Sequence, residues 1–166
     1  TPIGSVTVDY DNDPRPATAP DIGADEIVQA TAGVIAGGTY YNASAAPGDS
    51  LGGNVTINGA LYLNGVLTGG ANTLTLGCNG AVVGAGATNY VNGAVRKDFC
   101  ALGAFAFPVG QGAYTPVDVN VTALATNPSS LTATSFDAVL SPLAPGTSLS
   151  RNWLLTETGD LTADLI

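Results

Sequence analysis

The segment from residue 51 to residue 95 repeats one short pattern, in which a few alternating apolar residues are followed by a pair of turn-forming residues. These pairs are Asn-Gly or Gly-Gly, and they stand at 58–59, 64–65, 69–70, 79–80 and 92–93. Asn and Gly tolerate positive φ, so each pair predicts a tight turn. Between the turns, segments such as Val55–Ile57 and Leu61–Leu63 alternate apolar with polar residues, which predicts short strands with one buried face.

Two architectures fit short strands separated by Asn and Gly corners. One is a meander of antiparallel hairpins, and the other is a parallel β-solenoid that stacks the same strands and corners as rungs. We favour the solenoid for residues 51–95, because the strands are very short and the corners are small and uncharged. The spacing of the pattern is irregular, so the segment is not a strict sequence repeat.

The amino-acid composition excludes a helical bundle. The chain of 166 residues has 4 Lys and Arg, no Met, and as many as 22 Gly and 10 Pro. The solvent-facing sides of a bundle would lack strong helix formers with this composition. A hydrophobic content of 45% argues against disorder. We therefore predict an all-β protein.

Residues 96–166 predict longer strands, which are typical of a β-sandwich. Alternating apolar residues mark several of them: Val117, Val119, Val121, Leu131, Trp153, Leu155, Leu161 and Leu165. The sequence stops at Ile166 inside an apparent strand, so we expect the sandwich to be incomplete. Three parts are thus predicted: an acidic extended segment at 1–27, a short-strand solenoid or meander at 28–95, and a β-sandwich-like domain at 96–166.

Charge is sparse and acidic, with 13 Asp and Glu, 4 Lys and Arg, no His and a net charge of −9. A nucleic-acid partner is excluded, because binding phosphates needs a basic surface. Without His the chain lacks the usual general base and the Ser-His-Asp triad, and we predict no enzymatic activity. The basic doublet Arg96-Lys97, followed by Asp98, predicts a surface ion pair. Acids outside the first 27 residues are interpreted as solvated loop residues: Asp49, Asp98, Asp118, Asp137, Glu157, Asp160 and Asp164.

The candidate metal site is the alternating triplet Asp9, Asp11 and Asp13. Carboxylates at this spacing on a turning chain can converge on Ca²⁺, which takes six to eight oxygen ligands, and nearby acids could complete the shell. The alternative is a solvated acidic turn in which Arg15 pairs with one carboxylate. No other cofactor is predicted.

Two cysteines, Cys78 and Cys100, are the only ones in the chain. An even count in an extracellular chain favours a disulfide, and two buried free thiols are the alternative. An extracellular setting is itself suggested by residues 50–95, which contain no charged residue and must rely on Asn, Thr, Ser and Gly for solubility.

Two stretches resemble known bacterial families. The run Asp9-Tyr-Asp-Asn-Asp13-Pro-Arg15, followed by Asp21-Ile-Gly-Ala-Asp-Glu-Ile27, resembles the closing motif of secreted right-handed β-helix proteins. The stretch from Tyr90-Val-Asn-Gly to Phe105-Ala-Phe-Pro-Val-Gly110 is similar to modules of large cell-surface proteins, in which a short-strand β region precedes a sandwich. The resemblance implies an extracellular or cell-surface location and this architecture, but no activity.

We therefore predict a non-enzymatic extracellular structural protein, either a module of a bacterial surface protein or a self-assembling filament. Open strand edges can be completed by a neighbouring chain, so the predicted partner is another copy that donates a strand. The alternatives are a carbohydrate-binding or adhesive module that stacks its aromatic residues on surface glycans, and the non-catalytic tail of a β-helix polysaccharide-degrading enzyme. No stretch reaches about 18 apolar residues, which predicts no membrane insertion.

Overall fold

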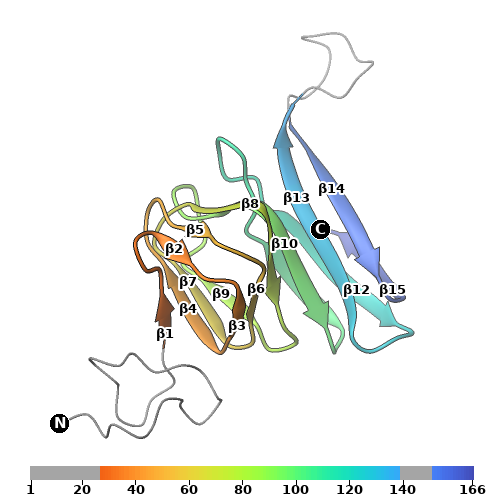
Figure 1. Cartoon of the computed structure of the whole chain (residues 1–166). Coiled ribbons are helices and arrows are strands. Elements are labelled where there is room, and N and C mark those ends of the chain that lie inside the picture. Colours follow the sequence, from red (N-terminus) through yellow and green to blue (C-terminus); the bar gives the residue numbers. More distant parts are fainter. Residues whose placement is uncertain (1–26, 139–150) are drawn as a thin grey trace, which may run out of the picture.

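The computed structural model describes residues 27–138 and 151–166, and these residues form strands and turns without any helix. They build a short solenoid, formed by strands β1 to β10, and a sandwich that follows it, as Figure 1 shows from left to right. The all-β prediction, with a solenoid followed by a sandwich-like part, is confirmed.

The solenoid strands are mostly two to four residues long. They are β1 (Ile27–Gln29), β2 (Val34–Ile35), β3 (Gly38–Tyr40), β4 (Asn42–Ala45), β5 (Ser50–Leu51), β6 (Val55–Ile57), β7 (Ala60–Leu63) and β9 (Ala81–Val83). Two strands are longer, and each bends across two faces of the solenoid: β8 (Leu67–Leu76) and β10 (Val91–Phe99).

Every pairing between solenoid strands is parallel, which is the mark of stacked rungs. One sheet has the order β1-β4-β7-β9, a second face runs through β2, β5, β8 and β10, and a third through β3, β6 and β8. A meander of hairpins would pair its strands antiparallel, so that alternative for residues 51–95 is wrong.

The rungs differ in length. In the first sheet, Ile27 pairs with Asn42, 15 positions later in the chain. The next rung separates Ala43 from Leu61 by 18 positions, and the following one separates Ala60 from Ala81 by 21. The repeat in space is therefore more regular than the repeat in sequence.

Stacked apolar side chains fill the solenoid. Val55, Leu74 and Val95 are in register on successive rungs, and at most 1% of the surface of each is exposed. Full burial of such a side chain stabilises the fold by about 1.5–3 kcal/mol. Each rung thus contributes a layer of core that the next rung covers.

Two of the predicted turns lie inside strands instead. Gly69-Gly70 is part of β8 and Asn92-Gly93 is part of β10, at the corner where both strands bend. The two corners stack closely, because a Cβ on Gly93 would lie 2.9 Å from the Cα of Gly69. Gly69 and Gly93 are needed here for contact between rungs, whereas Gly70 has open space around it and a φ of 62°, a conformation that favours glycine.

The chain does bend at Asn58-Gly59 and Asn64-Gly65, and it turns at Cys78-Asn79 just before Gly80. None of Gly59, Gly65 and Gly80 has a positive φ, so the predicted reason for these turns is wrong. A Cβ on each of these glycines would instead meet the backbone of the preceding rung.

The sandwich grows directly from the last rung of the solenoid. β10 pairs on one side with β8, in parallel, and on the other with β13 (Ser129–Asp137), antiparallel, and β13 then pairs with β14 (Arg151–Thr158). The predicted boundary between residues 95 and 96 falls inside β10, which belongs to both parts. One sheet therefore runs from β2 to β14 through solenoid and sandwich.

The second sheet of the sandwich has three antiparallel strands in the order β11-β12-β15. These are β11 (Gly103–Phe107), β12 (Val117–Leu124) and β15 (Leu161–Leu165). The side chains of Phe107, Val119 and Val121 are buried in one hydrophobic core that is continuous with the stacked residues of the solenoid.

Candidate functional site

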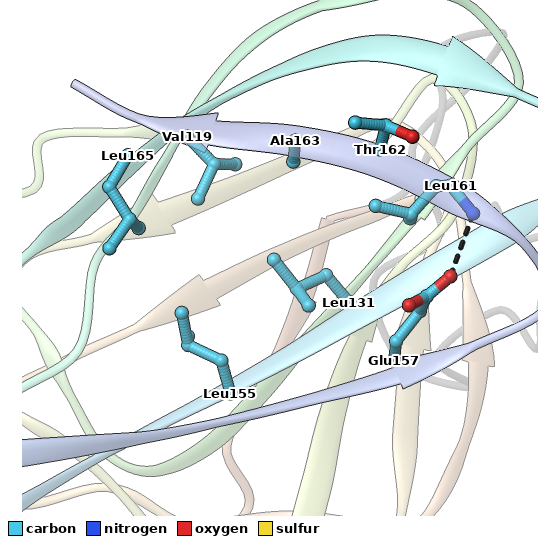
Figure 2. A pocket seen from close by; sticks show the side chains of 8 residues that line it. All are labelled: Val119, Leu131, Leu155, Glu157, Leu161, Thr162, Ala163 and Leu165. Carbon is cyan, nitrogen blue, oxygen red and sulfur yellow. Dashed lines mark hydrogen bonds between the residues drawn. The ribbon is translucent and has the colours of Figure 1, made fainter.

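The two sheets of the sandwich do not close on each other along one side. A cleft of about 320 Å³ remains between β13 and β14 on one wall and β12 and β15 on the other. Figure 2 shows its lining, which is mainly apolar: Val119, Leu131, Leu155, Glu157, Leu161, Thr162, Ala163 and Leu165.

The cleft is narrow at one end and open at the other. A tight turn joins β14 to β15, and across it the backbone N–H of Leu161 donates a hydrogen bond of 2.7 Å to the Glu157 carboxylate. Figure 2 shows the two strands converging beside this bond and separating toward Leu155 and Leu165. The one carboxylate in the lining is thus engaged in holding the narrow end.

Both strands that flank the opening have an unpaired edge. Within the part of the chain that the structure describes, β14 pairs only with β13, and β15 pairs only with β12. Large apolar side chains are exposed on the same strands, among them Leu154 at 56% and Leu165 at 68%. Free edges beside an apolar cleft are the usual requirements for adding a further strand.

A buried lysine closes the junction between solenoid and sandwich. The Lys97 Nζ donates hydrogen bonds to three backbone carbonyls of the turn before β9: Gly77 at 2.6 Å, Cys78 at 3.0 Å and Gly80 at 2.7 Å. The ammonium group also lies 5.5 Å from the centre of the Phe105 ring, within the range of a cation–π contact. These contacts give the lysine a structural role.

Burial lowers the pKa of Lys97, and the neighbouring Asp98 carboxylate opposes the shift by attracting the charged form. From the sequence, Lys97 is expected in a surface ion pair with its neighbours. Arg96 and Asp98 do form that pair, at 2.9 Å on the surface, whereas Lys97 points inward and is only 7% exposed. For Lys97 that interpretation is wrong.

Cys78 and Cys100 are joined as a disulfide beside Lys97, with their Cα atoms 5.4 Å apart, an ordinary separation for such a bond. Cys78 lies in the turn before β9, and Cys100 directly follows β10. The bond therefore ties the last turn of the solenoid to the strand that enters the sandwich.

The acidic residues are spread over the molecule. Asp49 is buried in a turn, where its carboxylate accepts a 2.8 Å hydrogen bond from the Ala46 N–H, so it is not the solvated loop acid expected from the sequence. In residues 27–138 and 151–166, no group of three or more His, Cys, Asp or Glu is placed to hold a metal ion. The triplet Asp9, Asp11 and Asp13 lies outside the described residues, and the calcium site remains a prediction.

The aromatic residues considered for glycan stacking lie in separate places. Tyr90 and Tyr114 contact each other at the sandwich, with ring centres 6.2 Å apart. Tyr62 is exposed on β7, while Trp153 is exposed on β14 and donates its indole N–H to the Thr115 carbonyl at 2.9 Å.

The alternating residues predict strands β14 and β15 but not the cleft between them, because alternation along one strand does not tell which other strand it faces. Lys97 had a usable signal, since it alternates with Val95 and Phe99, both of which are buried. A period of two along β10 places the lysine on the same inward face.

No helix capable of crossing a lipid bilayer occurs among the residues for which the structure gives a position. In comparisons with known proteins, no family model, curated protein sequence or solved structure matches this chain.

Proposed function

We propose that this protein is a non-enzymatic structural module of the extracellular surface that assembles with copies of itself by strand complementation. The observation that carries the proposal is the apolar cleft between β14 and β15, which is flanked by two strand edges with no pairing partner among residues 27–138 and 151–166. A monomer in water would leave this surface exposed, and β-augmentation would cover it.

The uncharged surface of the solenoid supports close packing of copies. Residues 50–95 carry no formal charge, so repulsion between neighbouring solenoids is weak despite the net charge of −9. The Cys78–Cys100 disulfide supports an oxidising, extracellular location. Lys97 is held by three carbonyls, which supports a structural role for the chain's single lysine.

Sedimentation velocity over a range of protein concentrations, combined with electron microscopy of negatively stained samples, tests the proposal. We expect particles that grow with concentration and appear as linear assemblies. A single monomeric species at every concentration would contradict self-assembly.

Glycan binding is the second candidate function, favoured by the outer face of the first solenoid sheet. There Ser44, Tyr62 and Val83 lie in register on β4, β7 and β9 and form an uncharged face with an exposed tyrosine ring. Such a ring could stack on a sugar. A glycan array in which the wild type gives hits that Tyr62→Ala loses and Val83→Ala keeps would support it, and an array without hits would count against it.

A further inference from the structure

We propose that residues 5–10 of a second copy occupy the cleft between β14 and β15 as an added strand. The inference rests on the proposed self-assembly and names both the acceptor and the donor. The acceptor is the cleft lined by Leu155 on β14 and by Leu161, Ala163 and Leu165 on β15.

The cleft has the form that a strand needs. Its walls are the inward rows of two neighbouring edge strands, and residues two apart on a strand repeat at about 6.8 Å. An added strand with apolar residues at every second position would place those side chains between Leu155 and the row Leu161–Leu165. Its backbone could pair with the edge that β14 leaves unpaired.

Residues 5–10 have this pattern. They read Ser-Val-Thr-Val-Asp-Tyr, so Val6, Val8 and Tyr10 share one face and Thr7 and Asp9 the other. The segment lies outside the described residues, ahead of β1 in the sequence. The three apolar residues of the donor would face the apolar cleft, and the opposite, polar face of the donor would remain in water.

Charge sets the direction of the added strand. The donor is followed by Asp11 and Asp13, and the narrow end of the cleft holds Glu157. Like charges repel, so the acidic end of the donor should lie toward the open end, where β14 begins at Arg151. The donor then runs antiparallel to β14, the more stable of the two pairing modes.

A second copy is taken as the occupant because the proposed self-assembly requires one chain to supply a strand to another. β1 is the outermost strand of the first solenoid sheet, while β14 and β15 bound the sandwich, as Figure 1 shows. Residues 11–26 can span at most about 55 Å when extended, which is enough to reach an adjoining molecule. The same length also reaches the cleft of the same chain, since β14 lies five strand spacings of about 4.8 Å from β2 in one sheet, and the peptide test below separates the two cases. A head-to-tail contact of this kind produces a linear chain unless the rotation between copies closes it into a ring.

The first test changes the donor in the full-length chain. Val8→Asp places a carboxylate in the apolar cleft, and Thr7→Asp adds the same charge on the opposite face of the same strand. We expect Val8→Asp to raise the concentration needed for assembly at least about tenfold, and Thr7→Asp to assemble close to wild type. If wild type and Val8→Asp assemble alike, the donor assignment is wrong while self-assembly stands.

The second test measures the acceptor directly. The Val8→Asp chain keeps an intact cleft, so a peptide of residues 1–13 should bind it one to one in calorimetry, and the same peptide carrying Val8→Asp should not. Absence of binding by the wild-type peptide would overturn the proposal. A wild-type chain that stays monomeric at all concentrations, while the Val8→Asp chain binds the peptide, would overturn the second copy as occupant and indicate insertion within one molecule.

Discussion

The solenoid covers its apolar residues within one chain, whereas the sandwich leaves part of its own exposed. Leu61 and Leu74 in the solenoid have no exposed surface, and each lies on a rung with neighbours above and below. Leu155 and Leu161 in the sandwich are only half-buried, because β14 and β15 are edges. In the solenoid each rung buries the apolar residues of the next rung. In the sandwich, where the two sheets separate along one side, a further strand is needed to bury those that remain exposed.

The largest effect expected from this difference is on stability. Leu74→Ala should lower the free energy of unfolding by about 2–5 kcal/mol, because it leaves a cavity inside the stack. Leu161→Ala should cost less than about 1.5 kcal/mol in a monomeric sample, because its side chain is already partly in water. Urea unfolding followed by circular dichroism measures both. Equal losses would mean that the sandwich is as closed as the solenoid.

The disulfide tests how far the two regions depend on each other. Cys78→Ser combined with Cys100→Ser opens a link across 22 positions and should lower the free energy of unfolding by about 2–4 kcal/mol. The bond joins the solenoid to the sandwich, so we expect its removal to reduce the protection of backbone amides from hydrogen exchange in both regions. Protection lost in one region alone would show that the two unfold independently.

Two alanine substitutions at glycines distinguish a steric clash between rungs from the cost of replacing a glycine in the chain. Gly93→Ala should cost about 1–3 kcal/mol, because the new Cβ would meet the Gly69 backbone. Gly86→Ala is the matched control, since a Cβ there meets nothing within 4 Å, and it should change stability by less than about 0.5 kcal/mol. Thermal unfolding compares the two, and a neutral Gly93→Ala would mean that the corners can move apart.

The smallest expected effect is a pH dependence that Lys97 confers on the junction. Its lowered pKa means that the folded chain releases this proton before the unfolded chain does near pH 10.5. Stability contributed by Lys97 should therefore rise with pH between the lowered pKa and 10.5. The raised pKa of Tyr114, caused mainly by burial, acts in the opposite direction above pH 10.0.

Lys97→Met isolates the contribution of the lysine to stability, because the titration of Tyr114 affects both proteins equally. The difference in unfolding free energy between wild type and variant should shift in favour of wild type as the pH rises toward 10.5. Chemical denaturation at several pH values measures it. A difference independent of pH would indicate that the lysine titrates alike in both states.

Local pattern was sufficient to predict the strands but not their neighbours. Asn58-Gly59 and Asn92-Gly93 are identical pairs, yet the first separates β6 from β7 and the second lies inside β10. A Cβ on either glycine would meet the adjacent rung, at Tyr41 for Gly59 and at Gly69 for Gly93, which lie 18 and 24 positions earlier in the sequence. A contact between rungs leaves no trace in the residues that flank the pair.

The same limit applies to the cleft. The alternation of Leu161, Ala163 and Leu165 predicts a strand with one apolar face. That this face meets Leu131 and Leu155 across a gap depends on how β13, β14 and β12 are ordered in two sheets. Sheet order is a property of the whole chain, whereas alternation is a property of one segment.

The unequal rungs have a consequence for how this chain finds its native alignment. Identical rungs could pair one step out of place with almost the same energy, and the error would persist as a trap. Here successive rungs take 15, 18 and 21 positions, so a strand displaced by one step would face a connection of the wrong length. The irregular spacing makes misaligned intermediates poor competitors and leaves a single alignment in which every corner fits.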